Sequence, residues 1–290
     1  MPARRRVIRA RAFAKINRTL QVMGIRPDGY HELRTVFQAV ALHDRLTFLP
    51  EPGPLRLECD EPGCPVDRSN LVWRAAASLW TASGRRGAPR GVFVRIEKRI
   101  PLQAGLGGGS SDAAAALRAL AALWNVTART RARLPELAAA LGADVPFFLE
   151  GGTVLGLDRG DTLFPLVDAV LAHVVLVLPD FGVSTVDAYR WWDADEPARR
   201  ESKRRTPSSG NDLQGPVTRR HPVIGRLASA LRRVGAQTAA MSGSGAAVFG
   251  LFPDARTAEA GAASLAGRGR RVIVTRTIGR AECRALAGPG

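Results

Sequence analysis

Residues 101–111 form a glycine-rich segment that could bind phosphate groups. The segment reads Pro-Leu-Gln-Ala-Gly-Leu-Gly-Gly-Gly-Ser-Ser and leads directly into an alanine-rich stretch, residues 112–120, which is typical of a helix. The start of a helix offers an anion unpaired backbone N–H groups and the positive end of the helix dipole. Glycine lets the backbone approach that anion closely because it has no Cβ atom. The segment therefore predicts a polyphosphate site, to which Ser110 and Ser111 could add hydroxyl donors or a helix cap.

The glycine spacing excludes the commonest nucleotide-binding loops. A Walker-type loop ends in Gly-Lys-Ser/Thr, whereas Gly109 is followed by Ser110. Counted from Gly105, the sixth place of a dinucleotide-binding fingerprint is also Ser110, and no acidic residue is suitably placed about twenty residues further on. A protein-kinase glycine loop lies in a hairpin and does not open a helix. A ligand-free Gly/Ser turn remains as the alternative, but a turn does not require so long a loop.

Four other motifs accompany this loop in serial order along the chain. They are Phe-Ala-Lys-Ile-Asn at residues 13–17, Asp-Gly-Tyr-His-Glu-Leu at 28–33, Gly-Ala-Asp-Val-Pro-Phe-Phe at 142–148 and Met-Ser-Gly-Ser-Gly-Ala at 241–246. Together with the loop they resemble the GHMP family of small-molecule kinases, over about residues 9–277. The resemblance implies a two-domain α+β fold of the GHMP kinase type, with the active site in the cleft between the domains. It also implies ATP as the phosphoryl donor and Mg²⁺ as the accompanying metal ion.

Phosphoryl transfer to an alcohol needs cations near the developing charge and a group that accepts the hydroxyl proton. Asp144 is the candidate base. Its spacing alone favours a helix N-cap, but the resemblance makes Gly-Ala-Asp-Val-Pro the motif of the catalytic aspartate. Lys15 by itself would be an ordinary strand lysine that extends its ammonium group to solvent. The resemblance implies that this group lies near Asp144 and lowers the barrier electrostatically, and that Asn17 contacts the acceptor hydroxyls.

Tyr30 and His31 resemble a cytidine-binding pair, in which the tyrosine ring stacks on the base and the imidazole hydrogen-bonds to its edge. Without the resemblance they would be an aromatic residue in a turn and a surface histidine. The implied acceptor is a small molecule with a cytidine diphosphate moiety, phosphorylated on the 2-hydroxyl of a methylerythritol unit. Homoserine, mevalonate or a sugar remains the alternative acceptor within the family, although none carries a nucleobase. Thr185 and Tyr189 match positions that complete the pocket from the second domain.

The remaining predicted site residues belong to ATP and to the metal ion. Asn70 is expected beside the adenine, and Asp112 is expected to face away from the phosphates because its charge would repel them. Ser111 is the first candidate for a Mg²⁺ ligand, and the other metal ligands are unknown. The loop at 242–245 resembles the third GHMP motif, which packs beside the phosphate loop. The predicted catalytic residues are Lys15 and Asp144; the ATP-binding residues are Asn70, Pro101, Leu102, Gln103, Ala104, Gly105, Leu106, Gly107, Gly108, Gly109, Ser110 and Ser111; the substrate-binding residues are Asn17, Tyr30, His31, Asp144, Thr185 and Tyr189; and the third-motif loop comprises Ser242, Gly243, Ser244 and Gly245.

Hydrophobic periodicity predicts the elements that position these residues. Residues 7–48 are expected to form strands, and alternation puts Lys15 and Asn17 on one face while Arg18 interrupts the apolar face. Residues 170–178 are a nearly unbroken apolar run, typical of a strand buried on both faces. Helices are predicted at about residues 70–83, 112–124, 134–141, 223–234 and 255–265, and further strands at 91–97, 247–251 and 271–277. We place the domain boundary after Pro165, with an ATP-binding N-terminal domain at 1–165 and a C-terminal domain at 166–290.

Composition limits the classes of function. The chain has 290 residues, of which 46% are hydrophobic, and a formal net charge of +16. Its arginines are scattered and aromatic residues make up only 6%, whereas a nucleic-acid platform concentrates charge and interleaves it with aromatic rings. A basic RNA-binding protein would also need neither Lys15 nor Asp144. We therefore expect no nucleic-acid partner, and no membrane partner either, because no apolar run is long enough to span a bilayer.

The cysteines and the chain start bear on the compartment. Three cysteines without metal-ligand spacing, and no apolar stretch typical of a secretory signal, predict a reduced, cytoplasmic protein. We expect a monomer or a weak homodimer. The segment at 196–210, rich in Arg, Ser and Pro, is predicted to be a mobile loop.

Overall fold

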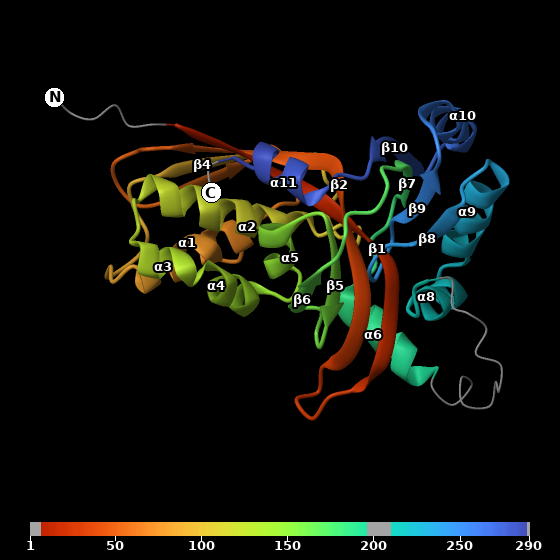
Figure 1. Cartoon of the computed structure of the whole chain (residues 1–290), viewed down its shortest axis with the longest axis horizontal. Helices are drawn as coiled ribbons and strands as arrows, with labels where there is room; N and C mark the ends of the chain where they lie inside the picture. Colours follow the sequence, from red (N-terminus) through yellow and green to blue (C-terminus); the bar gives the residue numbers. More distant parts are fainter. Residues whose placement is uncertain (1–6, 196–209, 289–290) are drawn as a thin grey trace.

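A computed structural model describes residues 7–195 and 210–288, which form two β-sheets with helices packed against them. The sheets lie side by side along the long axis of the molecule (Figure 1). This mixture of helices and strands confirms the predicted α+β class. Apart from Gly210, the segment predicted to be a mobile loop lies outside the described residues. Among the described residues, no helix has the length and apolar character that crossing a bilayer requires.

The first sheet has six strands and is built on a long hairpin. β1 (Ile8–Ile25) and β2 (His31–Leu49) pair antiparallel, and β2 also pairs with β4 (Phe93–Glu97) at one end and with β5 (Thr153–Leu157) at the other. β3 (Arg56–Cys59) extends the sheet beyond β4, and β6 (Thr162–Pro165) extends it beyond β5. The β1–β2 register shifts between Asn17 and Thr19, so Arg18 lies in a bulge. A bulge explains how a charged residue can interrupt the apolar face that alternation predicts.

Five helices lie on one side of this sheet (Figure 1). They are α1 (Leu71–Ala82), α2 (Gly108–Leu123), α3 (Ala128–Ala132), α4 (Leu134–Leu141) and α5 (Val145–Glu150). Here α2 packs against the strands, and α1 and α4 pack against α2. The predicted helices at 70–83 and 134–141 are thereby confirmed. α2 is the central helix, because its run of alanines is almost wholly buried between α1 and the sheet. Side chains this small let the helices and the sheet approach closely, which fixes the start of α2 at the edge of the core.

The second sheet has four antiparallel strands in the order β10–β7–β9–β8. These strands are β7 (His173–Pro179), β8 (Thr238–Met241), β9 (Val248–Phe252) and β10 (Arg270–Arg276). Around them lie α6 (Thr185–Ala194), α8 (Gln214–Arg220), α9 (Pro222–Arg233) and α10 (Ala255–Leu265). In β7, Val175 and Val177 face the cluster of these helices, while Val174 and Leu176 face the first sheet. The prediction of a strand buried on both faces is therefore correct.

The two sheets join through a shared apolar cluster. Ala14 and Ile16 of β1, Leu106 of the glycine-rich loop, and Leu176 and Phe249 of the second sheet all belong to it. The loop is therefore anchored where the sheets meet. The last helix, α11 (Arg280–Leu286), returns to the first sheet, where Cys283 packs with Phe13 and Phe147. The division of the chain at residue 165 remains a prediction.

The start of α2 differs from the prediction. The sequence suggested a helix from Asp112, but α2 begins at Gly108 and its N-cap is Gly107, which adopts a left-handed φ of 72°. No side chain caps this helix, so Ser110 and Ser111 are not its caps and instead belong to its first turn. Glycines 105 and 107 supply the left-handed conformations that bend the chain sharply into the helix, which lets the helix begin one turn earlier.

Candidate active site

A cavity of about 1050 Å³ opens between the two sheets. This volume lies at the upper end of the range for small-molecule sites, roughly 300–1,000 Å³. Its walls come from the β1–β2 hairpin, the glycine-rich loop, α6 and the loop between β8 and β9. The predicted site residues that line it are Lys15, Asn17, Tyr30, His31, Pro101, Leu102, Gln103, Ala104, Gly105, Leu106, Gly107, Gly108, Gly109, Ser110, Asp144, Thr185, Tyr189, Gly243, Ser244 and Gly245.

Lys15 and Asp144 form an ion pair in this cavity. Lys15 Nζ lies 3.3 Å from Asp144 Oδ2, and the lysine side chain is almost completely buried while that of Asp144 is 35% exposed. Asp144 does occupy the position before the first residue of α5, yet its side chain makes no capping hydrogen bond. The alternative of a simple helix cap therefore loses its physical basis, since the carboxylate faces a cation and the cavity instead.

A chain of hydrogen bonds orients the Lys15 ammonium. Lys15 Nζ donates to Asn17 Oδ1 at 2.6 Å, so the two side chains lie on one face of β1, as alternation predicts. Asn17 Nδ2 donates to Thr35 Oγ1 at 2.8 Å, and Thr35 Oγ1 donates to the Thr19 carbonyl at 2.7 Å. Because each donor has a defined acceptor, the buried ammonium has a fixed direction. Such preorganisation is what electrostatic catalysis requires.

The glycine-rich loop approaches other backbone segments so closely that side chains would not fit. A Cβ on Gly105 would lie 2.1 Å from the Ser242 carbonyl oxygen, and one on Gly107 would lie 2.5 Å from the Phe148 ring. The Lys15 N–H donates to the Leu106 carbonyl at 3.0 Å, which ties the loop to β1. The first turn of α2, with its unpaired N–H groups, consequently opens into the cavity beside Lys15.

A buried cluster of three charged residues lies beneath this loop. The Lys98 ammonium pairs with both Asp44 and Asp112, and Nζ is 2.8 Å from Asp112 Oδ2. Asp44 Oδ1 also accepts hydrogen bonds from the backbone N–H groups of Arg99 at 2.5 Å and Ile100 at 2.8 Å. Asp112 is thus buried against Lys98 and does not line the cavity, which agrees with the expectation that it faces away from the predicted phosphate site. The cluster therefore ties residues 98–100, which precede the glycine-rich loop, to α2, which follows it.

Burial governs the protonation of this cluster. It raises the pKa of Asp112 to about 7, against the opposing effect of the Lys98 ammonium, and the neighbouring charge of Asp44 adds to the rise. Burial alone would lower the pKa of Lys98, but Asp112 and Asp44 together raise it above its usual range. Lys98 therefore stays charged. Its charge is already matched by carboxylates, which makes it a structural cation rather than a free phosphate ligand.

Aromatic side chains gather in the part of the cavity that the β1–β2 hairpin and α6 line. The His31 ring stacks on Tyr189, with centroids 4.5 Å apart and an interplanar angle of 26°, and Trp192 meets His31 edge-on at 5.7 Å. His31 Nε2 lies 2.8 Å from Asp193 Oδ1. Tyr30 is 58% exposed. His31 thus already has a ring partner and a carboxylate partner, whereas the Tyr30 ring remains largely open for stacking.

The third-motif loop is fixed to the rest of the site by buried polar groups. Asn211 Nδ2 donates to the carbonyls of Met241 and Gly243, both at 2.8 Å. Ser242 Oγ donates to the Gly105 carbonyl at 2.9 Å, so this loop touches the glycine-rich loop directly. The hydroxyl groups of Thr185 and Ser244 lie 3.1 Å apart. The part of the chain around the second sheet therefore lines the cavity with both α6 and the loop between β8 and β9.

The sequence also matches known proteins. Residues 70–152 match the GHMP kinases N terminal domain and residues 199–271 match the GHMP kinases C terminal domain. The chain belongs to the GHMP kinase family. It is therefore an ATP-dependent small-molecule kinase, as the motifs predict.

Curated relatives resemble this GHMP kinase over nearly its whole length. The 4-diphosphocytidyl-2-C-methyl-D-erythritol kinase of Pelotomaculum thermopropionicum is 43% identical over 94% of this chain and 98% of its own. The enzyme of the same name from Moorella thermoacetica is 44% identical over 92% of this chain and 98% of its own.

Solved structures share the fold of this GHMP kinase. A 4-(cytidine 5'-diphospho)-2C-methyl-D-erythritol kinase superposes with a TM-score of 0.77 and 37% identity, covering 94% of this chain and all of the other. Methanococcus jannaschii mevalonate kinase superposes with a TM-score of 0.66 over 96% of this chain and all of its own, at 12% identity. The second likeness reflects the fold alone.

Three predicted site residues of this kinase do not line the cavity. Asn70 caps α1, since its Oδ1 accepts from the Val72 N–H at 2.8 Å and its Nδ2 donates to the Pro65 carbonyl. Ser111 is buried and lines a separate small cavity with Arg118 and Phe147. Ser242, the first residue of the third-motif loop, is buried, and its hydroxyl donates to the Gly105 carbonyl.

Several residues around this site were not predicted, and four of them carry a charge or hold a loop in place. Lys98, Arg159 and Asp193 line the cavity, and Asn211 holds the third-motif loop. Of these, only Lys98 gave a usable signal, because it stands three residues before the glycine-rich segment. Asn211 follows the Arg-, Ser- and Pro-rich segment at 196–210, which contains no recognisable motif. The contacts of Arg159 and Asp193 join segments that are distant in the sequence, so only the fold reveals them.

Proposed function

We propose that this kinase transfers the γ-phosphoryl group of ATP to the 2-hydroxyl of 4-diphosphocytidyl-2-C-methyl-D-erythritol, a step in the non-mevalonate route to isoprenoid precursors. The observation that carries the proposal is the 3.3 Å Lys15–Asp144 pair, which lies in a cavity lined by a glycine-rich helix start as well as by Tyr30 and Tyr189. An acceptor that carries a nucleobase has a use for such rings, whereas homoserine, mevalonate and simple sugars do not.

Each residue has a defined part in the proposed reaction. The N–H groups at the start of α2 bind the phosphates of ATP, and Ser110 adds its hydroxyl. Asp144 accepts the proton from the acceptor hydroxyl as the oxygen attacks the γ-phosphorus. Lys15 stabilises the negative charge that develops between the acceptor oxygen and the γ-phosphorus. Asn17 orients Lys15 and lies where it can contact the hydroxyl groups of the acceptor.

Magnesium would come with ATP rather than occupy a dedicated cage. Among the described residues, no group of three or more His, Cys, Asp or Glu side chains is arranged to hold a metal ion. The cavity offers the carboxylate of Asp144 and the hydroxyl of Ser110, which suits an ion bound mainly by phosphate oxygens and water. The ion would neutralise phosphate charge. Ser111 faces a different cavity, so Ser110 replaces it as the candidate hydroxyl ligand.

A coupled assay that follows ADP release tests the proposed acceptor. The purified kinase is given ATP with 4-diphosphocytidyl-2-C-methyl-D-erythritol, homoserine, mevalonate or galactose in turn. We expect turnover with the first compound alone, and competitive inhibition by CDP against the acceptor. Turnover with another member of the panel, or no inhibition by CDP at millimolar concentration, would overturn the acceptor assignment while leaving the kinase activity intact.

The cytoplasmic location and a monomeric or weakly dimeric state remain our predictions. Sedimentation of the purified chain tests the second of these. A tight dimer at nanomolar concentration would contradict it.

A further inference from the structure

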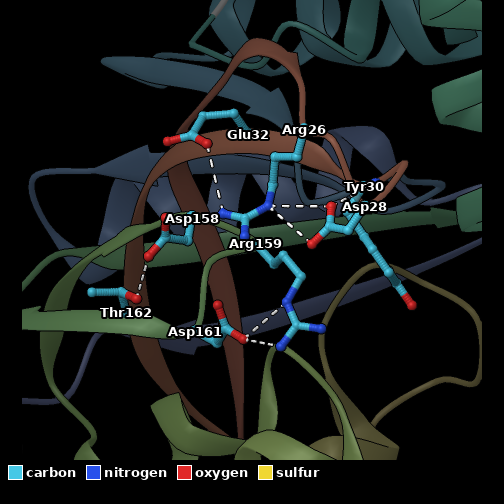
Figure 2. Close-up of polar contacts among 8 residues, drawn as sticks. All are labelled: Arg26, Asp28, Tyr30, Glu32, Asp158, Arg159, Asp161 and Thr162. Carbon is cyan, nitrogen blue, oxygen red and sulfur yellow. Dashed lines mark hydrogen bonds and ion pairs between the residues drawn. The ribbon is translucent and has the colours of Figure 1, made fainter.

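The turn of the β1–β2 hairpin lies against the turn between β5 and β6, and Arg26 joins the two (Figure 2). Its Nη1 donates to Asp158 Oδ1 on the second turn at 3.0 Å. Its Nε lies 3.3 Å from both carboxylate oxygens of Asp28 on its own turn. Glu32 Oε2 is a third acidic neighbour, 3.7 Å from Nη1. One guanidinium group therefore bridges two segments that lie far apart in the sequence.

Hydrogen bonds with Arg26 and Asp28 fix the backbone of Tyr30. The Arg26 N–H donates to the Tyr30 carbonyl at 2.7 Å, and the Tyr30 N–H donates to Asp28 Oδ1 at 3.1 Å. Asp28 can accept this hydrogen bond from Tyr30 because Arg26 holds the Asp28 carboxylate in place. The Leu33 N–H donates to the Asp158 carbonyl at 2.6 Å, which adds a backbone link between the turns. The backbone of residue 26 thus holds Tyr30 directly, whereas the Arg26 side chain acts on Tyr30 through Asp28.

The second turn presents Arg159 to the cavity. Asp158 adopts a left-handed φ of 59°, and its Oδ2 accepts from the Thr162 hydroxyl, so its side chain is held between Arg26 and Thr162. The next residue, Arg159, is paired with Asp161, and its guanidinium carbon lies 5.3 Å from the centre of the Tyr30 ring. Tyr30 and Arg159 both line the cavity, but Arg26 does not.

We propose that Arg26 is a positioning residue for the acceptor, which fixes Tyr30 and Arg159 relative to each other across the two turns. The proposal rests on the proposed function, because it takes the ligand at this end of the cavity to be a cytidine diphosphate group. Arg26 makes no contact with that group and takes no part in the chemistry. Its effect is confined to how well the two lining side chains are held for binding.

Charge gives the reason why an arginine is needed here. Asp28, Glu32 and Asp158 surround Arg26, and without its charge these three carboxylates would repel one another and separate the turns. The unmatched negative charge would also oppose the approach of a diphosphate. Both effects weaken acceptor binding. Neither reaches the glycine-rich loop, and exposed ion pairs of this kind contribute little to global stability.

Calorimetric binding of CDP and of a non-hydrolysable ATP analogue to the full chain tests the proposal. In Arg26→Gln we expect the Kd for CDP to rise about 3- to 10-fold, in the lower part of the range of coupling between contacting residues, with the Kd for the ATP analogue unchanged. Arg26→Lys should retain part of the affinity, because it keeps the charge but cannot bridge both turns. Arg56→Gln is the matched control, since Arg56 likewise pairs with carboxylates, those of Glu51 and Glu58, but it lies on β3, at the opposite edge of the first sheet from β6.

A double variant and turnover measurements separate positioning from a general structural effect. The double variant Arg26→Gln/Asp158→Asn should lose less free energy of CDP binding than the two single variants together. The reason is that both substitutions remove the same bridge. The KM for the acceptor should rise while kcat at saturation stays within about twofold.

The outcomes that would overturn the proposal are distinct. If the wild type binds CDP and Arg26→Gln binds it equally well, the positioning role of Arg26 is overturned while the proposed acceptor stands. An equal loss of affinity for the ATP analogue overturns it in favour of a structural role. Failure of the wild-type chain to bind CDP overturns the proposed acceptor and this inference with it.

Discussion

The ammonium nitrogen of Lys15 lies 3.3 Å from Oδ2 of Asp144, although Lys15 precedes the glycine-rich loop in the sequence and Asp144 follows it. Lys15 belongs to the middle of β1, and Asp144 immediately precedes α5. Their meeting point is also where the first turn of α2 opens. A carboxylate, a fixed cation and the start of a helix therefore converge on one volume, and these are the groups that the proposed phosphoryl transfer requires.

Replacing Asp144 by asparagine tests its role as the base. Asp144→Asn should lower kcat by roughly 10²–10⁴, the usual contribution of general acid–base catalysis, and leave the binding of an ATP analogue nearly unchanged. The isosteric amide keeps the volume but cannot accept the proton. Single-turnover kinetics together with calorimetry measure the two effects. A kcat within a few-fold of wild type would reduce Asp144 to a structural residue at the start of α5.

A side chain on Gly109 should block phosphate binding without disturbing the fold. Gly109 lines the cavity, has an ordinary φ, and a Cβ there would meet only Leu71 Cδ1, at 3.7 Å. Gly108 is a less suitable position, because a Cβ there would lie 3.2 Å from Lys98 Nζ. Gly109→Val should therefore weaken ATP binding by at least about tenfold, or ~1.4 kcal/mol.

Calorimetry on Gly109→Val measures this change, with Gly24→Val as the control. Gly24 lies on β1 and would gain its Cβ in open space. Unchanged ATP affinity in Gly109→Val would contradict a phosphate site at the start of α2.

The buried carboxyl of Asp112 should make stability depend on pH. Its pKa is raised to about 7 when folded, against about 4 in the unfolded chain, so between these values the folded protein retains a proton that the unfolded chain releases. The free energy of unfolding therefore falls as pH rises through this window. Asp112→Asn removes this loss, so its stability relative to wild type should increase by roughly 1–3 kcal/mol from pH 4.5 to pH 7.5.

Urea unfolding at several pH values measures that difference, and Asp254→Asn gives a control of opposite sign. Asp254 caps α10, and the hydrogen bond from the Thr257 N–H lowers its pKa, so its contribution is present at neutral pH and is lost on acidification. A stability difference for Asp112→Asn that stays constant with pH would show that burial does not perturb Asp112.

The exposed ring of Tyr30 should contribute to acceptor binding alone. If a cytosine stacks on it, Tyr30→Ala should cost roughly 1–3 kcal/mol, or about 5- to 150-fold in the KM for the acceptor, with the KM for ATP unchanged. CDP should inhibit the wild type and inhibit this variant poorly. Phe164→Ala is the control, because Phe164 is similarly exposed but lies outside the cavity lining. Equal acceptor KM values in Tyr30→Ala and wild type would place the base elsewhere.

Local features of the chain could be predicted from the sequence because neighbouring residues determine them. The glycine-rich segment and the helix after it are contiguous, so their order alone predicts a phosphate site. Alternation along β1 puts Lys15 and Asn17 on one face, and their 2.6 Å hydrogen bond agrees with that pattern. The apolar run of β7 likewise predicts burial on both faces.

Contacts between distant segments were decided by the tertiary structure. Nothing in the sequence around Asp144 distinguishes a carboxylate that caps α5 from one that faces Lys15, because both choices satisfy the same local geometry. Packing around the second sheet brings Asn211 to the third-motif loop, and the approach of α6 to β2 brings Asp193 to His31. Arg26 could be located on a turn from the sequence, but its bridge to Asp158 exists only because β2 pairs with β5 and brings the two turns together. Local patterns fix which elements form, whereas long-range pairing of strands and burial of apolar surface determine which charged side chains meet.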